Sequence, residues 1–338
     1  MPSAKELRNA TTREMRSGHK AKVLSVAWSQ SGARLATGAY DQSVRVFSLQ
    51  GNQVSPTATV LLGHAADVDQ VIFHPQIEHV LASAGADKTV RLWDVRTNSK
   101  PIHVIQTPGE NINIAWSPDG NTIAVGSKDD VITFIDPRGG SAASAETSTA
   151  SKTPSQKYIW HTLKRDYEVN EIKWDNSGNF FYLTTGHGTV QILEFPSFKP
   201  VHAIAAHTGN CYCIDFDPMG RYMAIGSNDS LVSLWDLDEY VCIRTLGQLD
   251  MPVRVMTFAH CGEIIAMAGT EDKAIDIASV ETGETLYSVP VSTAPETASW
   301  HPSKYILAFC GEPSMSKSGM SSRSGSSMDV NIGFYSLQ

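Results

Sequence analysis

Residues 63–94, GHAADVDQVIFHPQIEHVLASAGADKTVRLWD, contain three short, largely apolar runs separated by turn residues. The runs cover Asp69–His74, His79–Ala84 and Thr89–Asp94. Pro, Gly, Asp and Lys lie between them, and such residues favour turns. Runs of this length and composition predict β-strands. The i, i+3, i+4, i+7 spacing of an amphipathic helix is not sustained across them.

The same pattern recurs along the chain. It is marked by an aromatic residue two positions after an apolar one, at Trp28, Phe73, Trp116, Trp174, Phe216, Phe258 and, with Ala298 before it, Trp300. Consecutive aromatics are 42 to 45 residues apart, except for one interval of 58 residues that contains the Ser-, Thr- and Ala-rich segment 139–156. Seven repeats of this length, each with several short strands, predict an all-β fold, a seven-bladed β-propeller.

Four positions of the second repeat define a known family. Gly63-His64 precedes its first strand, Ser83 lies in the second, Asp87 in the following turn, and Trp93-Asp94 ends the third. In these residues the repeat resembles the WD40 family. The resemblance implies a structural tetrad, in which His64, Ser83, Asp87 and Trp93 form a hydrogen-bonded network that braces the blade. A buried polar chain of this kind costs little only when every member has a partner.

The other repeats keep parts of this set, and we interpret all of these residues as structural and none as catalytic. The first repeat has His19, Thr37 and Asp41, with Phe47 in the Trp position. The fifth has His207, Asp229 and Trp235, with Ile225 in the Ser position. The remaining matches are Asp129 in the third repeat, Asp272 in the sixth and, in the Asp position of the fourth, His187.

The last repeat lacks one strand. Its predicted strands cover Glu296–His301, Tyr305–Cys310 and Val330–Leu337. We expect residues near Thr11–Arg16 to supply the fourth, because that closure leaves no exposed edge in the ring. The chain is therefore predicted to be a single WD40 propeller domain, residues 1–338, closed by an N-terminal strand.

Two low-complexity inserts interrupt the repeats, at 139–156 and 313–328. Both are rich in small and hydroxyl-bearing residues and poor in large apolar ones, so we expect flexible loops. The first follows the third strand of its blade and should emerge on the bottom face of the propeller. The second joins the second and third strands of the last blade and should emerge on the top face.

The charge of the chain is uneven. The formal net charge is −8, but residues 1–22 alone carry +4. The negative net charge argues against a protein that binds nucleic acid through its whole surface. The basic N-terminal segment is interpreted either as a solubilising arm or as a local contact with RNA or an acidic partner. Five cysteines without a CxxC pair fit a reducing compartment. The chain shows no signal peptide and no apolar run long enough for a membrane, so we expect a soluble, intracellular protein.

Signals of catalysis are missing from the sequence. His202 and His207 have no Cys or carboxylate at metal-site spacing, and neither a P-loop nor a dinucleotide-binding glycine pattern occurs. We therefore predict no enzyme activity, no catalytic residue, no cofactor and no metal.

Several stretches resemble a narrower family. Residues 109–136, GENINIAWSPDGNTIAVGSKDDVITFID, and 168–174, EVNEIKW, are similar to the THO complex subunit 3 family, as are 17–29, 216–244 and 270–283. The resemblance covers nearly the whole chain except the two inserts. It implies a nuclear scaffold in the hetero-oligomeric THO/TREX assembly, which couples transcription to mRNA packaging and export. The implied partners are other THO/TREX subunits. RNA would be contacted indirectly or through the basic N-terminal segment.

The position four residues before each repeat aromatic is variable and mostly polar. Its residues are Leu24, Asp69, Ile112, Asn170, Tyr212, Arg254 and Glu296. We expect this position where the innermost strand enters from the top rim. The polar members, Asp69, Asn170, Tyr212, Arg254 and Glu296, are the candidate residues for partner recognition.

A different function is indicated by Trp93-Asp94-Val95-Arg96. This run matches the WDxR box of WD40 substrate receptors that dock on cullin-type ubiquitin ligases. The alternative interpretation is an ordinary repeat end followed by a basic residue.

Overall fold

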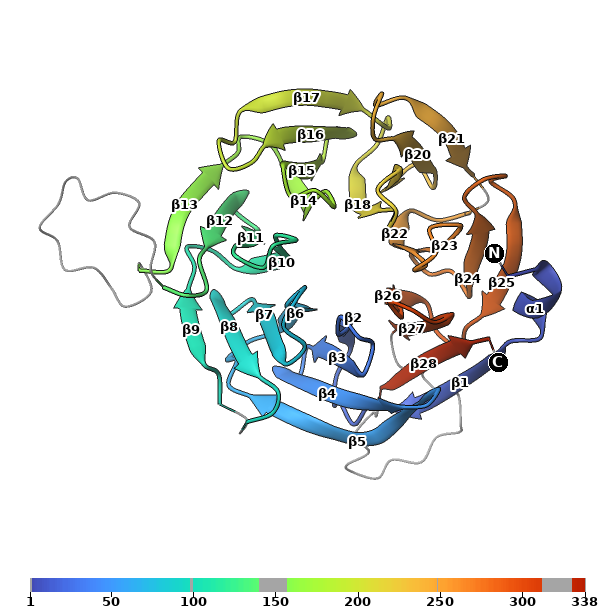
Figure 1. Ribbon diagram of the computed structural model, residues 1–338, viewed down its shortest axis with the longest axis horizontal. Helices are drawn as coiled ribbons and strands as arrows, with labels where there is room; N and C mark the ends of the chain where they lie inside the picture. Colours follow the sequence, from blue (N-terminus) through green and yellow to red (C-terminus); the bar gives the residue numbers. More distant parts are fainter. Residues whose placement is uncertain (1, 98–99, 140–156, 248, 312–329, 338) are drawn as a thin grey trace, which may run out of the picture.

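The computed structural model describes residues 2–97, 100–139, 157–247, 249–311 and 330–337. Within these residues the strands form seven antiparallel four-stranded sheets, arranged as the blades of a ring (Figure 1). The predicted seven-bladed β-propeller is confirmed. The predictions for the two inserts concern residues that lie, apart from Gly139, outside the described part of the chain.

Each blade has an inner, a second, a third and an outer strand, and blades 1 to 7 are numbered from β2 onward. The inner strands are β2 (Val23–Trp28), β6 (Val68–Phe73), β10 (Asn111–Trp116), β14 (Val169–Trp174), β18 (Cys211–Phe216), β22 (Val253–Phe258) and β26 (Pro295–Trp300). The second strands are β3 (Arg34–Ala39), β7 (Val80–Gly85), β11 (Ile123–Ser127), β15 (Phe180–Thr185), β19 (Tyr222–Ser227), β23 (Ile264–Gly269) and β27 (Ile306–Gly311). The third strands are β4 (Ser43–Gln50), β8 (Thr89–Asp94), β12 (Val131–Ile135), β16 (Thr189–Glu194), β20 (Val232–Asp236), β24 (Ala274–Ser279) and β28 (Asn331–Ser336). The outer strands are β5 (Gln53–Leu62), β9 (His103–Gln106), β13 (Ile159–Lys164), β17 (Pro200–Ala205), β21 (Cys242–Leu246), β25 (Thr285–Pro290) and β1 (Thr11–Arg16).

The hydrophobic core is divided among the junctions between blades. Each cluster of buried side chains joins two neighbouring blades; at one junction Val46 of blade 1 packs with Phe73 and Trp93 of blade 2. Because both faces of a blade meet another blade, the second strands are apolar on both sides, and every residue of β23 and of β27 is buried. The inner three strands of each blade are therefore closely packed, whereas outer strands such as β17 are largely exposed.

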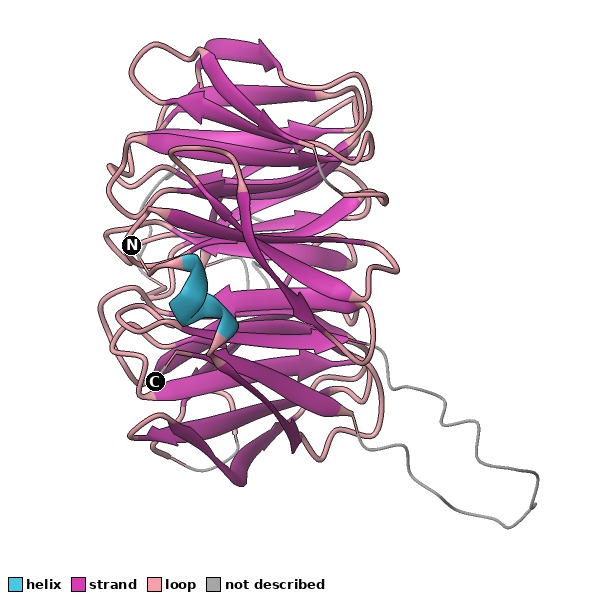
Figure 2. Ribbon diagram, turned by 90° about the vertical axis from the view of Figure 1, so that its right-hand side faces the viewer, coloured by secondary structure: helices cyan, strands magenta, loops and turns pink. Residues whose placement is uncertain are grey.

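The ring closes between the two ends of the chain. β1 pairs antiparallel with β28, from Thr11 opposite Ser336 to Arg16 opposite Asn331, so the predicted closure is confirmed. The short helix α1 (Ala4–Arg8) precedes β1, and Ser3 caps its N-terminus. Figure 2 shows α1 on the outer side of the ring, near both chain ends.

Helix α1 is fixed to the propeller by one apolar side chain and one hydrogen bond. Leu7 is fully buried in the core cluster between blades 6 and 7, and the Tyr335 hydroxyl donates to the Leu7 carbonyl oxygen at 2.6 Å. The N-terminal segment is therefore part of the wall of the ring and not a free arm from Ala4 onward.

A β-bulge lies near the start of every inner strand of the described chain. The register shifts between the first and third residues, for example between Val68 and Gln70 in β6. The residue that the bulge leaves without a partner is the position four residues before the repeat aromatic in each of β2, β6, β10, β14, β18, β22 and β26. A bulge changes the direction in which a side chain points and interrupts the backbone pairing. The side chain at this position therefore does not follow the in–out alternation of the rest of the strand.

Candidate interaction surface

We define the top face as the side that carries the connections from the outer strand of one blade to the inner strand of the next, such as residues 63–67 and 206–210. The bulge residues lie one position inside the inner strands, next to these connections. We name this ring of bulge residues the top rim. Its polar members form separate interactions in different blades, which gives each part of the rim its own chemistry.

On blades 5 and 6 the top rim carries an aromatic ring with a cation above it. The guanidinium carbon of Arg254 lies 4.2 Å from the centre of the Tyr212 ring, and the Tyr212 hydroxyl donates to Asn228 Oδ1 at 3.2 Å. Such a stack is worth about 0.5–1 kcal/mol at an exposed site. Arg254 is exposed, so this part of the rim offers a positive charge to solvent.

Glu296 and Asn170 form different contacts. Glu296 of blade 7 is paired with Lys22 of blade 1, with 2.6 Å between Oε1 and Nζ. Asn170 of blade 4 donates from Nδ2 to the carbonyl oxygen of Cys211 in blade 5 at 3.0 Å. Both residues connect neighbouring blades, so part of the predicted rim contributes to the cohesion of the ring.

Asp69 lies in an acidic part of the top rim, on blade 2. Burial, reinforced by the negative charges of Asp67 and Glu110, raises the pKa of Asp69 to about 7 against the opposite effect of Lys128. Its Oδ2 atom is buried without a hydrogen-bond partner, while Lys128 Nζ lies 2.8 Å from Glu110 Oε2. Burial of an ionised carboxylate without a full set of hydrogen bonds lowers the stability of the folded protein at neutral pH.

The four predicted tetrad residues of blade 2 lie together. The Trp93 indole N–H donates to Ser83 Oγ at 2.9 Å, Ser83 Oγ lies 2.7 Å from His64 Nε2, and His64 Nδ1 lies 3.0 Å from Asp87 Oδ2. Because the indole only donates and the carboxylate only accepts, the chain of donors runs from Trp93 through Ser83 and His64 to Asp87. Burial alone would raise the pKa of Asp87; hydrogen bonds from His64 and from the Ala65 N–H outweigh it and lower this pKa.

Blade 5 builds the same network with a serine that the sequence analysis missed. Ile225 stands in the expected Ser position, but Ser233 of the neighbouring strand β20 lies 2.8 Å from His207 Nε2 and accepts from Trp235 Nε1 at 2.8 Å. His207 Nδ1 lies 2.9 Å from Asp229 Oδ2. The alternation of Ser233 and Trp235 on one strand is the signal that could have identified it.

The innermost strands present an edge toward the ring axis, and side chains of the preceding blade satisfy several of its N–H groups. The Val71 N–H donates to Ser25 Oγ at 3.1 Å, the Ile114 N–H to Gln70 Oε1 at 2.5 Å, and the Val26 N–H to Thr297 Oγ1 at 3.3 Å. Unpaired backbone N–H and C=O groups at the edge of a sheet can otherwise form hydrogen bonds with a strand of another chain. These side chains therefore both connect the blades and protect the inner edge.

Charged residues replace this pattern at blades 4 and 5. Lys173 forms an ion pair with Asp215, whose other oxygen accepts from the Phe258 N–H at 2.8 Å. Burial raises the pKa of the nearby Glu171 to about 7. The cluster ties blades 4, 5 and 6 together.

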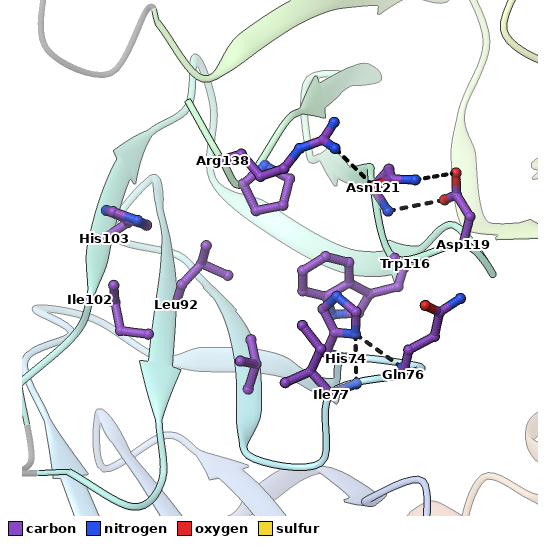
Figure 3. Close-up of a pocket in the computed structure, with 13 residues that line it drawn as sticks. His74, Gln76, Ile77, Leu92, Ile102, His103, Trp116, Asp119, Asn121 and Arg138 are labelled. Atoms are coloured by element: carbon purple, nitrogen blue, oxygen red, sulfur yellow. Dashed lines mark hydrogen bonds between the residues drawn. The ribbon is translucent and has the colours of Figure 1, made fainter. Parts of the chain in front are cut away.

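The opposite, bottom face has a pocket at the junction of blades 2 and 3 (Figure 3). Its volume is about 320 Å³, and Leu92, Ile102, His103, Trp116 and Pro137 are among its lining residues. The Trp116 ring lies against His74, with 4.6 Å between ring centres. The pocket is mainly apolar, as ligand and side-chain pockets usually are.

Arg96, the basic residue of the WDxR run, is held by its own repeat. Its Nη2 and Nε atoms donate to the two carboxylate oxygens of Asp94 at 2.7 and 3.0 Å. Arg138 forms the same bidentate contact with Asp136 in blade 3, where the Trp is absent. The arrangement is thus a recurring feature of these repeat ends and does not favour the ubiquitin-ligase function.

Two searches cover the described residues alone. No group of three or more His, Cys, Asp or Glu side chains there is placed to hold a metal ion. No helix in that part of the chain is long and apolar enough to span a bilayer.

Comparison with known sequences identifies close similarity. A family model described as the THOC3 beta-propeller domain matches residues 19–310. THO complex subunit 3 of Arabidopsis thaliana is 44% identical over 296 residues, which are 87% of this chain and 88% of that protein. The WD repeat-containing protein AAC3 of Dictyostelium discoideum is 29% identical over 318 residues, which are 87% of this chain and 63% of that protein.

Among solved structures, the β-propeller domain of Cps50 (Swd1) from Myceliophteria thermophila superposes with a TM-score of 0.75. The match covers 97% of this chain and all of that domain at 16% identity. This likeness concerns the fold alone.

Proposed function

The chain belongs to the THOC3 beta-propeller family, and on this basis we propose that it is the propeller subunit of a THO complex and acts as a non-catalytic scaffold for its protein partners. One observation carries the proposal. The identity of 44% to a THO complex subunit 3 extends over 87% of this chain and 88% of the relative, so the similarity covers nearly the whole of both proteins.

The geometry suits a scaffold. The ring is closed by the pairing of β1 with β28, and the top rim presents a cation over an aromatic ring at Arg254 and Tyr212, an ion pair at Glu296, and an acidic group around Asp69. Different chemistry at different blades lets one ring hold several partners, because polar contacts fix orientation and specificity.

We further propose that the protein works in the nucleus as a hetero-oligomer with other THO/TREX subunits, in the coupling of transcription to mRNA packaging and export. RNA contact is indirect or uses the basic N-terminal segment, where Lys5, Arg8 and Arg13 are exposed on α1 and β1. The whole propeller is acidic, which supports protein contacts over general binding to nucleic acid.

Affinity purification of the tagged chain from nuclear extract treated with RNase tests the proposal. We expect the large THO subunits in stoichiometric amounts, and depletion of the chain should impair mRNA export more than protein turnover. Arg254→Glu should weaken the association if the top rim is used, whereas Lys199→Glu, at an exposed lysine just before β17, should leave it intact. Recovery of a cullin-ligase adaptor that depends on Arg96, without THO subunits, would contradict the proposal.

A further inference from the structure

The top rim holds a cation in a defined place between blades 5 and 6. The guanidinium carbon of Arg254 lies 4.2 Å from the centre of the Tyr212 ring, and both side chains start from bulge positions of the neighbouring inner strands β22 and β18. The Tyr212 hydroxyl donates to Asn228 Oδ1 at 3.2 Å. The cation thus lies on a ring that is itself anchored, so little conformational freedom is left to lose when Arg254 binds a ligand.

Within the described part of the chain, Arg254 has the Tyr212 ring as its contact and no carboxylate at ion-pair distance. Other cations near the top face do have one. The pairs are Lys22 with Glu296 at 2.6 Å, Lys128 with Glu110 at 2.8 Å and Arg91 with Asp87 at 3.6 Å. The chain has 35 acidic against 27 basic side chains, so carboxylates are in excess, and yet this exposed guanidinium keeps its donors for a group outside the chain.

On the other side of the ring the rim has the opposite charge. Figure 1 shows β6 of blade 2 across the central axis from β18 and β22. Asp69 in β6 has Asp67 and Glu110 as neighbours of like charge, and the nearby Lys128 is already paired with Glu110. A negatively charged group that approaches the top face is therefore repelled at blade 2 and attracted at blades 5 and 6.

A carboxylate fits the surroundings of Arg254 better than the phosphates of a nucleic acid. A nucleic-acid strand carries a phosphate at every nucleotide and is bound by several cations. The top connections of blade 6 instead carry three carboxylates, Asp250, Glu271 and Asp272, against one lysine, Lys273. These acidic groups would repel a row of phosphates. A single acidic side chain needs only the one guanidinium, whose N–H groups match the two oxygens of a carboxylate.

We propose that Arg254, held on the Tyr212 ring, binds the carboxylate of an aspartate or glutamate in a segment of a protein partner that lies on the top face at blades 5 and 6. The proposal rests on the proposed function, which supplies protein partners, and it names the chemistry that this part of the rim recognises. The guanidinium donates to both carboxylate oxygens while the Tyr212 ring lies beneath it. A charged contact of this kind mainly determines which partner binds and in which orientation.

The first experiment uses small probes and the isolated full-length chain. In NMR of the chain labelled with nitrogen isotope at its arginines, N-acetyl-Gly-Glu-Gly-amide should shift the Nε–Hε signal of Arg254, which the Arg254→Lys variant identifies by its absence. The same peptide with glutamine in the central place should leave that signal unchanged. Lys88→Gln, which removes an exposed lysine from the top face of blade 2, should not alter the shift. Absence of the shift, equal effects of the two peptides, or tighter binding of hexauridylate RNA at this signal would overturn the proposal.

The second experiment uses the complex reconstituted with the large THO subunits. Arg254→Lys keeps the positive charge and supplies an amine, which a water-soluble carbodiimide joins to a carboxylate in contact with it. We expect mass spectrometry to find a cross-link from position 254 to an aspartate or glutamate of a partner.

Binding measurements on the same complex complete the test. Arg254→Gln should weaken it by about tenfold, as truncation of one member of an interfacial charge pair does, and Lys88→Gln should leave it unchanged. Wild-type affinity of Arg254→Gln, or an Arg254→Lys complex without the cross-link, would overturn the proposal. Failure of the wild type to bind would contradict the proposed function, and the peptide titration would still decide the Arg254 site.

Discussion

Asp87 is the terminal acceptor of the blade 2 network, and its side chain is 6% exposed. It also accepts from the Ala65 N–H, the Thr89 N–H and the Thr89 hydroxyl. Asp87→Ala should therefore lower the free energy of unfolding by about 1–3 kcal/mol, because it leaves buried donors unpaired. Asp272→Ala should lower the free energy of unfolding by less. It removes the acceptor of one N–H, that of Gly269 at 2.6 Å, and burial raises the pKa of Asp272, so its charged form is already unfavourable in the folded state. Equal losses in urea denaturation would refute this ranking.

Ser233 has the role in blade 5 that Ser83 has in blade 2. Each hydroxyl lies between a histidine and an indole N–H. Ser233→Ala and Ser83→Ala should both destabilise the protein by roughly 1–3 kcal/mol, because each removes the acceptor of an indole N–H, that of partly buried Trp235 or that of fully buried Trp93. Denaturation curves of the two variants would test the equivalence, and a Ser233→Ala protein as stable as the wild type would disprove it.

Asp69 should make stability depend on pH in the opposite direction from a paired carboxylate. Its folded pKa of about 7 lies above the value of about 3.9 in an unfolded chain. The folded state therefore binds the proton more tightly, and its contribution to stability falls as the pH rises from about 4 to about 7. Asp69→Asn should accordingly raise the melting temperature more at pH 8 than at pH 5. As a control, Asp166→Asn removes an exposed negative charge and should show no such trend.

At the scale of elements, the segment formed by α1 and β1 determines whether the ring stays closed. Leu7 is fully buried, so Leu7→Ala should cost about 2–5 kcal/mol through loss of apolar contacts and the cavity left behind. Arg8→Ala, on the exposed side of the same helix, should change stability by about 0.5 kcal/mol or less. Urea denaturation of the two variants decides the point, and similar stabilities would show that α1 does not hold the closure.

The sequence pattern predicted the inner strands but not the residue at which each of them starts. The sequence predicts inner strands beginning at Asp69 and Glu296, but pairing begins one residue earlier, at Val68 and Pro295. The bulge is the reason, because it lets the preceding residue pair with the end of the second strand while the bulged residue stays unpaired. Local alternation identifies the strand, and the bulge becomes visible only once the partner strand is known.

At the scale of the whole molecule, the repeat period and the missing fourth strand of the last repeat were sufficient to predict the seven blades and their closure by Thr11–Arg16. The predicted roles of the top-rim residues stay predictions. Ser233 was missed because it replaces a residue of a different strand.

The pairing of β1 with β28 also fixes the order in which the protein can be completed. The ribosome makes β1 (Thr11–Arg16) long before β28 (Asn331–Ser336), so blade 7 stays open while the residues between these two strands are made. At a translation rate of roughly 5–20 residues per second, this period is on the order of 20–70 s. Blades 1 to 6 have their strands in chain order and can form while the nascent chain grows. The closing step, by contrast, waits until β28 has been made, and until then the unpaired edge of β1 is open to pairing with other chains.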